Sequence, residues 1–204
     1  NVQGTVKVLE ASRFYKIKKF VYAASASCYG KTKKPVDENH KINLEHPYAL
    51  SKFLGEKAVL HWHKVYGLPV NSIRIFNAYG TRSRTSGAYG AVMGVFLKQI
   101  IAKKPLTIVG NGKQKRDFIH VEDIVEGLKE IAFSDLNHDD AWELGTGINY
   151  SINDLFKYFN KKFDVESYNL PDQPGNYRVT LRKNDDTLNL LNWTPKDRLE
   201  EYIN

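Results

Sequence analysis

The chain has 204 residues, of which 42% are hydrophobic and 26% are charged, so it is long enough for one good core or two small lobes. No apolar run approaches the roughly 20 residues that cross a bilayer, and the single cysteine, Cys28, excludes an internal disulfide framework. We expect a soluble cytoplasmic protein whose net charge of +7 suits phosphorylated small molecules, with no membrane or nucleic acid as a partner, because its basic clusters are short and are not interleaved with aromatic residues.

The first part of the chain alternates helices with strands. Residues 1–17 have helical periodicity, and residues 18–25 form an apolar run of strand length that ends in small residues. A long helix is expected over residues 47–66, because proline suits the first helical turn and Gly67 can end it. The apolar stretch 68–76 predicts the next buried strand. This order indicates a parallel sheet with helices on its faces.

The rest of the chain contains shorter elements, which follow a loop rich in Gly, Ser and Thr at residues 81–94. The pattern predicts a lobe built on the sheet, interleaved with a smaller second lobe. The elements expected are, in chain order, a helix ending near residue 103, a strand at 106–110, a strand end and an amphipathic helix within 116–133, a strand at 141–147, a helix at 152–160, a strand near 164–168 and final helices.

The stretch HPYALSKFLGEK, residues 46–57, places Tyr48 four residues before Lys52. Spacing alone is a weak signal, because it recurs at Tyr15/Lys19, Tyr29/Lys33 and Tyr158/Lys162. Tyr48 and Lys52 differ in lying on one face in the first turns of a long helix, directly after a loop that leaves a strand end. A neighbouring ammonium lowers the pKa of a phenol, otherwise about 10, and so favours a general base. The alternative is a surface tyrosine packed beside a lysine stem.

Ser25 stands at the end of the strand that precedes this helix. Ligands of parallel sheets bind at the carboxyl ends of the strands, so a serine there can hydrogen-bond a sugar hydroxyl and relay its proton to Tyr48. The alternative is a hydroxyl that caps its own strand end. Ser25, Tyr48 and Lys52 together form a candidate catalytic set.

Six blocks of the sequence, in order, resemble the extended short-chain dehydrogenase/reductase family, and within it the NAD-dependent nucleotide-sugar epimerases and dehydratases of the UDP-galactose/UDP-glucose 4-epimerase type. The blocks are NVQGTVKVLEASR, KKFVYAASASCYG, HPYALSKFLGEK, LPVNSIRIFNAYG, KQKRDFIHVEDIVEGL and AWELGTG. The resemblance implies an α/β fold with a doubly wound parallel sheet, Rossmann-like but lacking its first strands, and a smaller α+β substrate-binding domain. It assigns residues 1–80 and 118–147 to the NAD-binding domain, and residues 81–117 and 148–204 to the nucleotide-sugar domain.

The resemblance also implies roles for individual residues. Tyr48 would remove a proton from a sugar hydroxyl as a phenolate, Lys52 would hold the ribose of the cofactor NAD and lower the tyrosine pKa, and Ser25 would align the hydroxyl. Asn1 and Phe76 would join these three in contacting NAD. The nucleotide-diphosphate sugar is expected to meet Asn77, Thr107, Val109, Arg116, Gln173 and Asn176.

The residues after Ser25 bear on the branch of the family. Dehydratases carry an acidic pair there, whereas this chain has Ala26 and Ser27, neither of which is an acid or base at neutral pH. The resemblance therefore favours 4-epimerisation of a UDP-hexose through a transient 4-keto sugar, in polysaccharide or glycan precursor synthesis. The small Thr180 stands where some relatives use a bulky residue to exclude N-acetyl groups, which favours tolerance of an N-acetylhexosamine, so the substrate is expected to be either a UDP-hexose or a UDP-N-acetylhexosamine. A dehydratase, an NAD(P)H-dependent reductase of the same fold and a catalytically silent binding homologue stay open.

The chain departs from the family pattern at two places. Gln173 and Asn176 replace the charged residues of an Arg-x-Gly-Asp/Glu segment, which removes an ion pair to phosphate and a strong acceptor for a ribose diol. The glycine-rich turn that binds the NAD pyrophosphate belongs upstream of Asn1, so we expect a piece of a longer protein. Residues 2–15 and 47–66 match the helices through which family members form homodimers. No metal site is expected.

Overall fold

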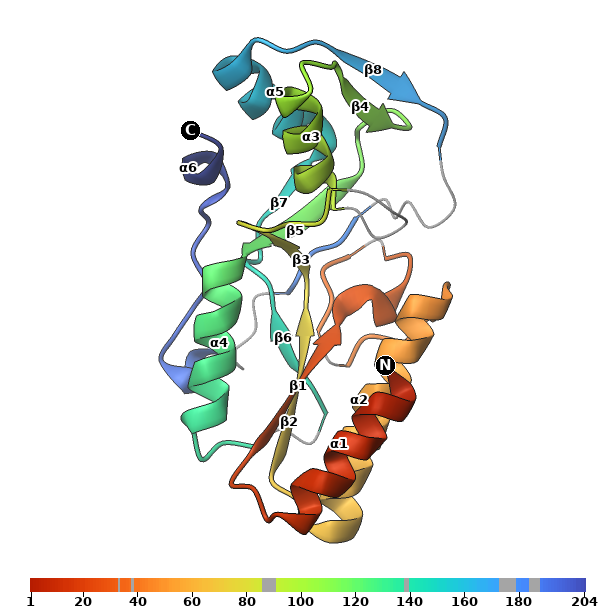
Figure 1. Ribbon diagram of the computed structural model, residues 1–204, viewed down its shortest axis with the longest axis vertical. Coiled ribbons are helices and arrows are strands. Elements are labelled where there is room, and N and C mark those ends of the chain that lie inside the picture. The colour runs from red at the N-terminus through yellow and green to blue at the C-terminus, as the bar shows by residue number, and fades with distance from the viewer. Residues whose placement is uncertain (33, 38, 86–90, 138–139, 173–178, 184–187) are drawn as a thin grey trace.

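The structure is a computed structural model that describes all residues except 33, 38, 86–90, 138–139, 173–178 and 184–187. Its elements form two lobes, one above the other along the long axis (Figure 1). Within the described ranges, no helix combines the length and the apolar character that crossing a membrane requires.

The lower lobe in Figure 1 is built on a three-stranded parallel sheet in the order β1-β2-β6. β1 (Phe20–Ser25) pairs with β2 (Val70–Ile75) along its whole length, and β2 pairs on its other side with the short β6 (Trp142–Leu144). Helices α1 (Val2–Phe14) and α2 (Pro47–Tyr66) cover one face of this sheet. β2 is buried along nearly its whole length because it is the central strand and both faces are covered.

Helix α4 (Val121–Phe133) covers the opposite face of the same sheet (Figure 1). A parallel sheet between helices confirms the predicted α/β class. The chain reaches α4 directly from a strand of the upper lobe, β5 (Lys115–His120). The two lobes are therefore connected through the backbone at this point, as they are where β2 is followed by β3 (Asn77–Tyr79).

The bounds of α2 agree with the sequence prediction because both ends carry local signals. Pro47 occupies the first turn, where its missing N–H costs nothing, and the ring nitrogen Nδ1 of His46 accepts from the Ala49 amide at 3.1 Å. Gly67 ends the helix in the left-handed region, at φ 66°, and its amide donates to the His63 carbonyl. Position 48 is thereby fixed in the first turn of a 20-residue helix.

The upper lobe contains two small sheets. In the first, the order is β3-β5-β7, with β5 parallel to β3 and antiparallel to β7 (Asn149–Ser151). In the second, β4 (Leu106–Val109) runs parallel to β8 (Ser167–Leu170). The remaining elements are the helices α3 (Val92–Ile101), α5 (Ile152–Phe163) and α6 (Leu199–Ile203), and the 3-10 turns η1 (Ala26–Tyr29) and η2 (Leu188–Leu191).

The upper lobe has its own apolar core, in which Phe96 of α3 meets Phe159 of α5 with ring centroids 5.6 Å apart. The lower lobe has a separate core around β2 and β6. Leu188, which the sequence placed in the second domain, is buried in this lower core beside Ile73 and Trp142. The predicted domain boundaries stay a prediction, but the C-terminal part of the chain packs against both lobes.

Candidate active site

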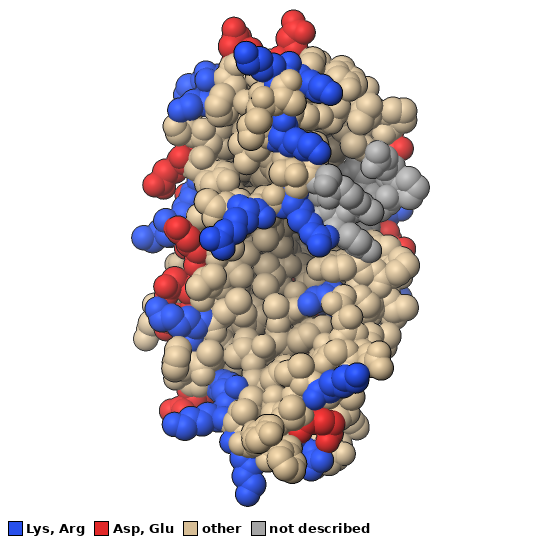
Figure 2. All heavy atoms as spheres, in the orientation of Figure 1, with Lys and Arg blue, Asp and Glu red and all other residues tan. Residues whose placement is uncertain are grey.

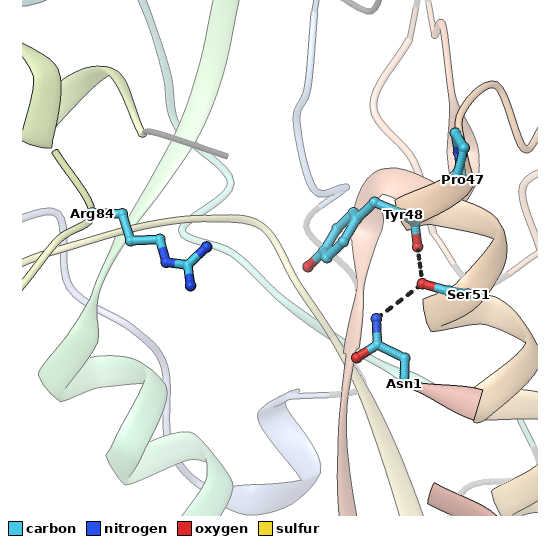
Figure 3. Close-up of a pocket in the computed structure, with 5 residues that line it drawn as sticks. All are labelled: Asn1, Pro47, Tyr48, Ser51 and Arg84. Atoms are coloured by element: carbon cyan, nitrogen blue, oxygen red, sulfur yellow. Dashed lines mark hydrogen bonds between the residues drawn. The ribbon is translucent and has the colours of Figure 1, made fainter. Parts of the chain in front are cut away.

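A cavity of about 480 Å³ lies where the first turn of α2 meets the start of α1. Its wall is formed by Asn1, Pro47, Tyr48, Ser51 and Arg84. Figure 3 shows the Tyr48 hydroxyl and the Arg84 guanidinium pointing toward each other from opposite sides. Figure 2 shows that the molecule is hollowed between its lobes and that Lys and Arg side chains gather along the upper rim of the hollow. The surroundings therefore favour an anionic ligand.

Asn1 is tied directly to the first turn of α2. Its amide Nδ2 donates to Ser51 Oγ at 2.9 Å, and Ser51 Oγ donates to the Tyr48 carbonyl at 2.9 Å (Figure 3). The ring of Tyr48 stacks on that of His46, with centroids 6.1 Å apart. The structure thus brings the predicted cofactor contact Asn1 and the predicted base Tyr48 to one cavity.

Lys52 lies one turn further along α2 and reaches the first strand. Its ammonium donates to the Ala23 carbonyl of β1 and lies 4.6 Å from the centroid of the Tyr22 ring. Burial lowers the pKa of Lys52, because a half-buried ammonium loses part of its hydration. The charge is therefore held two residues before Ser25, at the carboxyl end of β1.

Ser25 has the capping role that the sequence left open as an alternative. Its Oγ accepts from the Ser27 amide at 3.3 Å and lies 2.9 Å from Ser27 Oγ, which fixes the start of η1. A relay from Ser25 to a sugar hydroxyl stays a prediction. Because a hydroxyl has two lone pairs and a rotatable proton, the cap leaves capacity for a further bond.

Phe76 and Asn77 lie where the chain passes from the lower to the upper lobe. Phe76 is buried in a cluster with Cys28, Tyr29 and Val36. The amide nitrogen of Asn77 donates to the Asp117 carbonyl at 2.9 Å and to Thr180 Oγ1 at 2.7 Å. Both acceptors belong to the chain, so a donation from Asn77 to a diphosphate requires one of these bonds to break.

The remaining predicted substrate contacts lie in the upper lobe. Thr107 Oγ1 accepts from Gln99 Nε2 at 2.8 Å, and Arg116 donates from Nη1 to the Lys115 carbonyl at 2.9 Å. Val109 lies on β4 beside β8. Of the predicted site residues that the structure describes, Asn1 and Tyr48 line the cavity and the others lie outside its wall. The predicted contacts Gln173 and Asn176 lie outside the described residues.

The whole chain has known relatives. Residues 1–145 match the model of the NAD dependent epimerase/dehydratase family. The chain belongs to this family. A putative UDP-glucose 4-epimerase of Methanocaldococcus jannaschii is 34% identical, over an alignment that covers 100% of this chain and 66% of the relative.

Solved epimerase structures share the fold of this chain. A UDP-N-acetylglucosamine 4-epimerase from Methanobrevibacter ruminantium M1, in complex with UDP-N-acetylmuramic acid, has a TM-score of 0.93 at 28% identity, covering 100% of this chain and 66% of that one. A UDP-glucuronic acid 4-epimerase from Bacillus cereus, in complex with UDP-glucuronic acid and NAD, has a TM-score of 0.89 at 27% identity, with coverage of 99% and 64%. The chain therefore spans about two thirds of the length of the relatives that it matches.

These findings confirm the Rossmann-like α/β fold and the family that the sequence blocks indicated. The cofactor of the epimerase/dehydratase family is NAD. The described residues fit its reactive end. A roomy cavity adjoins Asn1 and Tyr48, and the half-buried Lys52 contacts β1 near its carboxyl end, where ligands of parallel sheets bind.

Sequence reasoning missed Arg84, which forms the cavity wall opposite Tyr48. The carbonyl of Arg84 packs on Gly94, where a Cβ atom would lie only 2.2 Å from it, so this glycine permits the close approach of the loop. No hydrogen bond or ion pair of the Arg84 side chain is found among the described residues. The available signal was an arginine in the Gly-, Ser- and Thr-rich loop after a strand, a common position for ligand contacts.

Proposed function

We propose that this protein is an NAD-dependent nucleotide-sugar 4-epimerase acting on a UDP-hexose or UDP-N-acetylhexosamine. The observation that carries the proposal is the placement of Tyr48 on a cavity wall with Lys52 one helical turn behind it. The lowered pKa of Lys52 arises from burial in the same region. The three relatives described above are named as UDP-sugar 4-epimerases, which supports the reaction class.

In this reaction Tyr48, as phenolate, takes the proton of the sugar 4-hydroxyl. NAD, when bound, would supply the acceptor for the hydride of the ring carbon, and the donor of a hydride once the 4-keto sugar has turned its other face. Tyr48 gives its proton back to the same oxygen, so the cycle consumes no cofactor and no net proton. Lys52 would hold the ribose of NAD beside Tyr48, and the Ser25 hydroxyl would orient the sugar oxygen.

The residues after Ser25 favour epimerisation over dehydration. The amide and the hydroxyl of Ser27 both form hydrogen bonds with the Ser25 hydroxyl, and Ala26 packs against the apolar cluster that contains Phe76. Neither side chain can supply the acid or base that removing water from a sugar carbon requires. An epimerase needs a single group at the 4-hydroxyl, and Tyr48 meets that need.

A UDP-uronic acid is a second candidate substrate, favoured by Arg84. Its guanidinium points into the cavity toward the Tyr48 hydroxyl (Figure 3). A sugar whose 4-hydroxyl is held at Tyr48 carries its carboxylate on the adjacent ring carbon, C5, so that group would lie in the same cavity as Arg84. A planar guanidinium matches a carboxylate with two parallel hydrogen bonds. The Bacillus cereus neighbour, which was solved with UDP-glucuronic acid, supports testing this class.

The first test is Tyr48→Phe in the native polypeptide that carries this chain, with Tyr66→Phe on the same helix as matched control. We expect kcat for 4-epimerisation to fall by roughly 10²–10⁴-fold in Tyr48→Phe, because one general base is removed. Binding of UDP-sugar, measured by calorimetry, should change by less than about threefold because the ring is retained. Turnover by Tyr48→Phe at the rate of the control would contradict the mechanism.

A comparison of kcat/KM values for Arg84→Gln tests the substrate class. Arg82→Gln, a change at a nearby exposed arginine, serves as the control. For a uronic acid substrate, Arg84→Gln should lower kcat/KM at least tenfold for UDP-glucuronic acid and leave UDP-glucose turnover within about twofold. Equal effects on the two substrates would refute the uronic acid candidate. They would leave the UDP-hexose or UDP-N-acetylhexosamine reading in place.

We also propose that the protein forms a homodimer through α1 and α2, which lie side by side in Figure 1. Val8 of α1 and Leu50 and Leu54 of α2 are large apolar side chains exposed to solvent. Exposed apolar residues at such spacing favour a helical interface. Leu54→Glu should convert the dimer to monomer in light scattering, and a dimer that survives this change would contradict the interface.

A further inference from the structure

A buried ionic cluster lies one turn beyond Lys52 on α2. We call it the Arg74 cluster, and it consists of Arg74, Glu56, Tyr29, Glu143 and Asp140. Arg74 and Glu56, 0% and 1% exposed, form a fork in which Nε donates to Oε2 at 3.0 Å and Nη2 donates to Oε1 at 2.6 Å. The Arg74 Nη1 donates to the Tyr29 hydroxyl at 2.7 Å, and that hydroxyl donates to Glu143.

The cluster joins the elements that carry the proposed catalytic residues. Glu56 follows Tyr48 and Lys52 at intervals of four, so the three share one face of α2. Tyr29 ends η1, the turn that begins immediately after Ser25. The guanidinium itself comes from β2, and its Nη2 also donates to Asp140 at 2.9 Å. One side chain thus holds α2, η1 and the sheet in a fixed relation.

Stability alone does not account for such a cluster. Removing charges from water costs several kcal/mol per ion, and apolar residues of similar volume often serve a core as well or better. Burial disfavours the charged form of Arg74, yet its hydrogen bond to Glu56 and the neighbouring Tyr29 raise the pKa above its ordinary value. The guanidinium is therefore a permanent charge with a fixed fork, which specifies orientation as an apolar contact cannot.

We propose that Arg74 is a positioning residue: by clamping Glu56 it sets the rotation of α2 against the sheet, and so the place of Tyr48 and Lys52 at the cavity. The inference rests on the proposed function for the roles of Tyr48 and Lys52. It goes beyond that function in assigning their placement to a side chain that does not touch the cavity. A displacement of about 1 Å at reacting atoms can cost about 10²-fold in rate, so the clamp is expected to affect kcat.

The test variant removes every fully buried charge of the cluster at once: Glu56→Leu, Arg74→Met and Glu143→Gln. The glutamine keeps an acceptor for the Tyr29 hydroxyl, so no buried charge loses its partner. The matched control removes another arginine–carboxylate fork, Asp123→Leu with Arg198→Met, which joins α4 to the start of α6. Urea unfolding first establishes that both variants are folded.

The cluster variant should lower kcat at least tenfold with KM within about threefold, whereas the control variant keeps the parent kcat. Amide hydrogen exchange at residues 48–52 should become faster in the cluster variant and not in the control. Parent kcat and parent exchange in a folded cluster variant would overturn the proposal. Arg74→Lys, which keeps the charge but not the fork, is the second variant, and parent kcat and exchange there overturn it equally.

The exchange measurement separates this proposal from the proposed function. If the parent protein does not epimerise any UDP-sugar, the proposed function fails, but exchange at residues 48–52 still tests the clamp. If the parent epimerises and either the cluster variant or Arg74→Lys matches it in kcat and in exchange, the clamp alone fails.

Discussion

Asp117 connects three segments of the upper lobe through one buried carboxylate, so its substitution should be costly. Oδ1 accepts from the Thr146 amide and hydroxyl, both at 2.8 Å, and Oδ2 accepts from the amides of Gly147 and Arg182, both at 3.0 Å. The side chain is fully buried. Burial raises the pKa of Asp117, and its hydrogen bonds oppose that rise.

The costs of Asp117→Asn and Asp117→Ala follow from counting donors. If the asparagine turns its oxygen toward the amides of Gly147 and Arg182, its NH₂ group faces the Thr146 amide, and two donors then oppose each other. The Thr146 hydroxyl can adapt, because it can accept a hydrogen bond from that NH₂ group and donate its own proton to the Ile148 carbonyl, 3.2 Å away. One amide loses its acceptor, at about 2 kcal/mol. Alanine removes the acceptor from three amides, and the buried amide of Arg182 has the least access to water. We therefore expect Asp117→Ala to lower the free energy of unfolding by about 4 kcal/mol.

The assay is equilibrium unfolding in urea, with Asp135→Asn at an exposed position as the control. The midpoint should fall in the order control, Asp117→Asn, Asp117→Ala, with the slope m unchanged. If the free energy of unfolding of Asp117→Ala lies within about 1 kcal/mol of that of the control, water can replace the carboxylate as the acceptor for these amides. In that case the carboxylate does not hold these segments together.

Three further changes test local features of the fold. Ser151→Ala removes the capping box of α5 and should cost about 1 kcal/mol at pH 7. The Ser151 hydrogen bond lowers the pKa of Asp154, so this stabilisation is present above the ordinary pKa of 3.8 and lost as pH falls through the lower folded value. A cost that stays the same from pH 7 to pH 3 would contradict this. Gly55→Ala places a Cβ atom 2.2 Å from the Tyr22 hydroxyl of β1, so it should lower Tm and reduce the free energy of unfolding by about 2 kcal/mol, although alanine is the better helix former. A raised Tm would refute the close contact. Phe159→Ala should cost about 3–5 kcal/mol in urea unfolding, against less than about 0.5 for Phe133→Ala at an exposed position, and equal costs would be inconsistent with the upper core.

Local signals explain what the sequence could predict of the fold. The bounds of α2 follow from Pro47 and Gly67, and the parallel order of the lower sheet follows from alternating elements. β3 and β7 went unpredicted because each has only three residues and exists through pairing with the distant β5. The strand predicted near 164–168 lies at Ser167–Leu170, since α5 continues to Phe163 and ends on Asp164 in the left-handed region.

In the candidate site, too, some residues could be predicted from local sequence signals and others could not. Tyr48 and Lys52 could be paired from their spacing because a helix converts four residues into one face. Arg84 faces Tyr48 across a cavity formed by segments far apart in sequence, which no local pattern encodes. Arg74 did leave a signal, a charged residue within an apolar strand, whose meaning depends on the partners that the fold supplies.

Along one face of α2, the side chains become progressively more buried from the cavity toward the Arg74 cluster. Tyr48 borders the cavity, Lys52 is half-buried against β1, and Glu56 is enclosed with Arg74. Eight residues separate Tyr48 from Glu56, about 12 Å along the helix at 1.5 Å per residue. Because an α-helix is stiff over that length, a rotation permitted at Glu56 displaces Tyr48 as well. On the proposed roles, the fork between Arg74 and Glu56 would therefore fix the position of Tyr48 at the cavity while leaving its hydroxyl open to ligand.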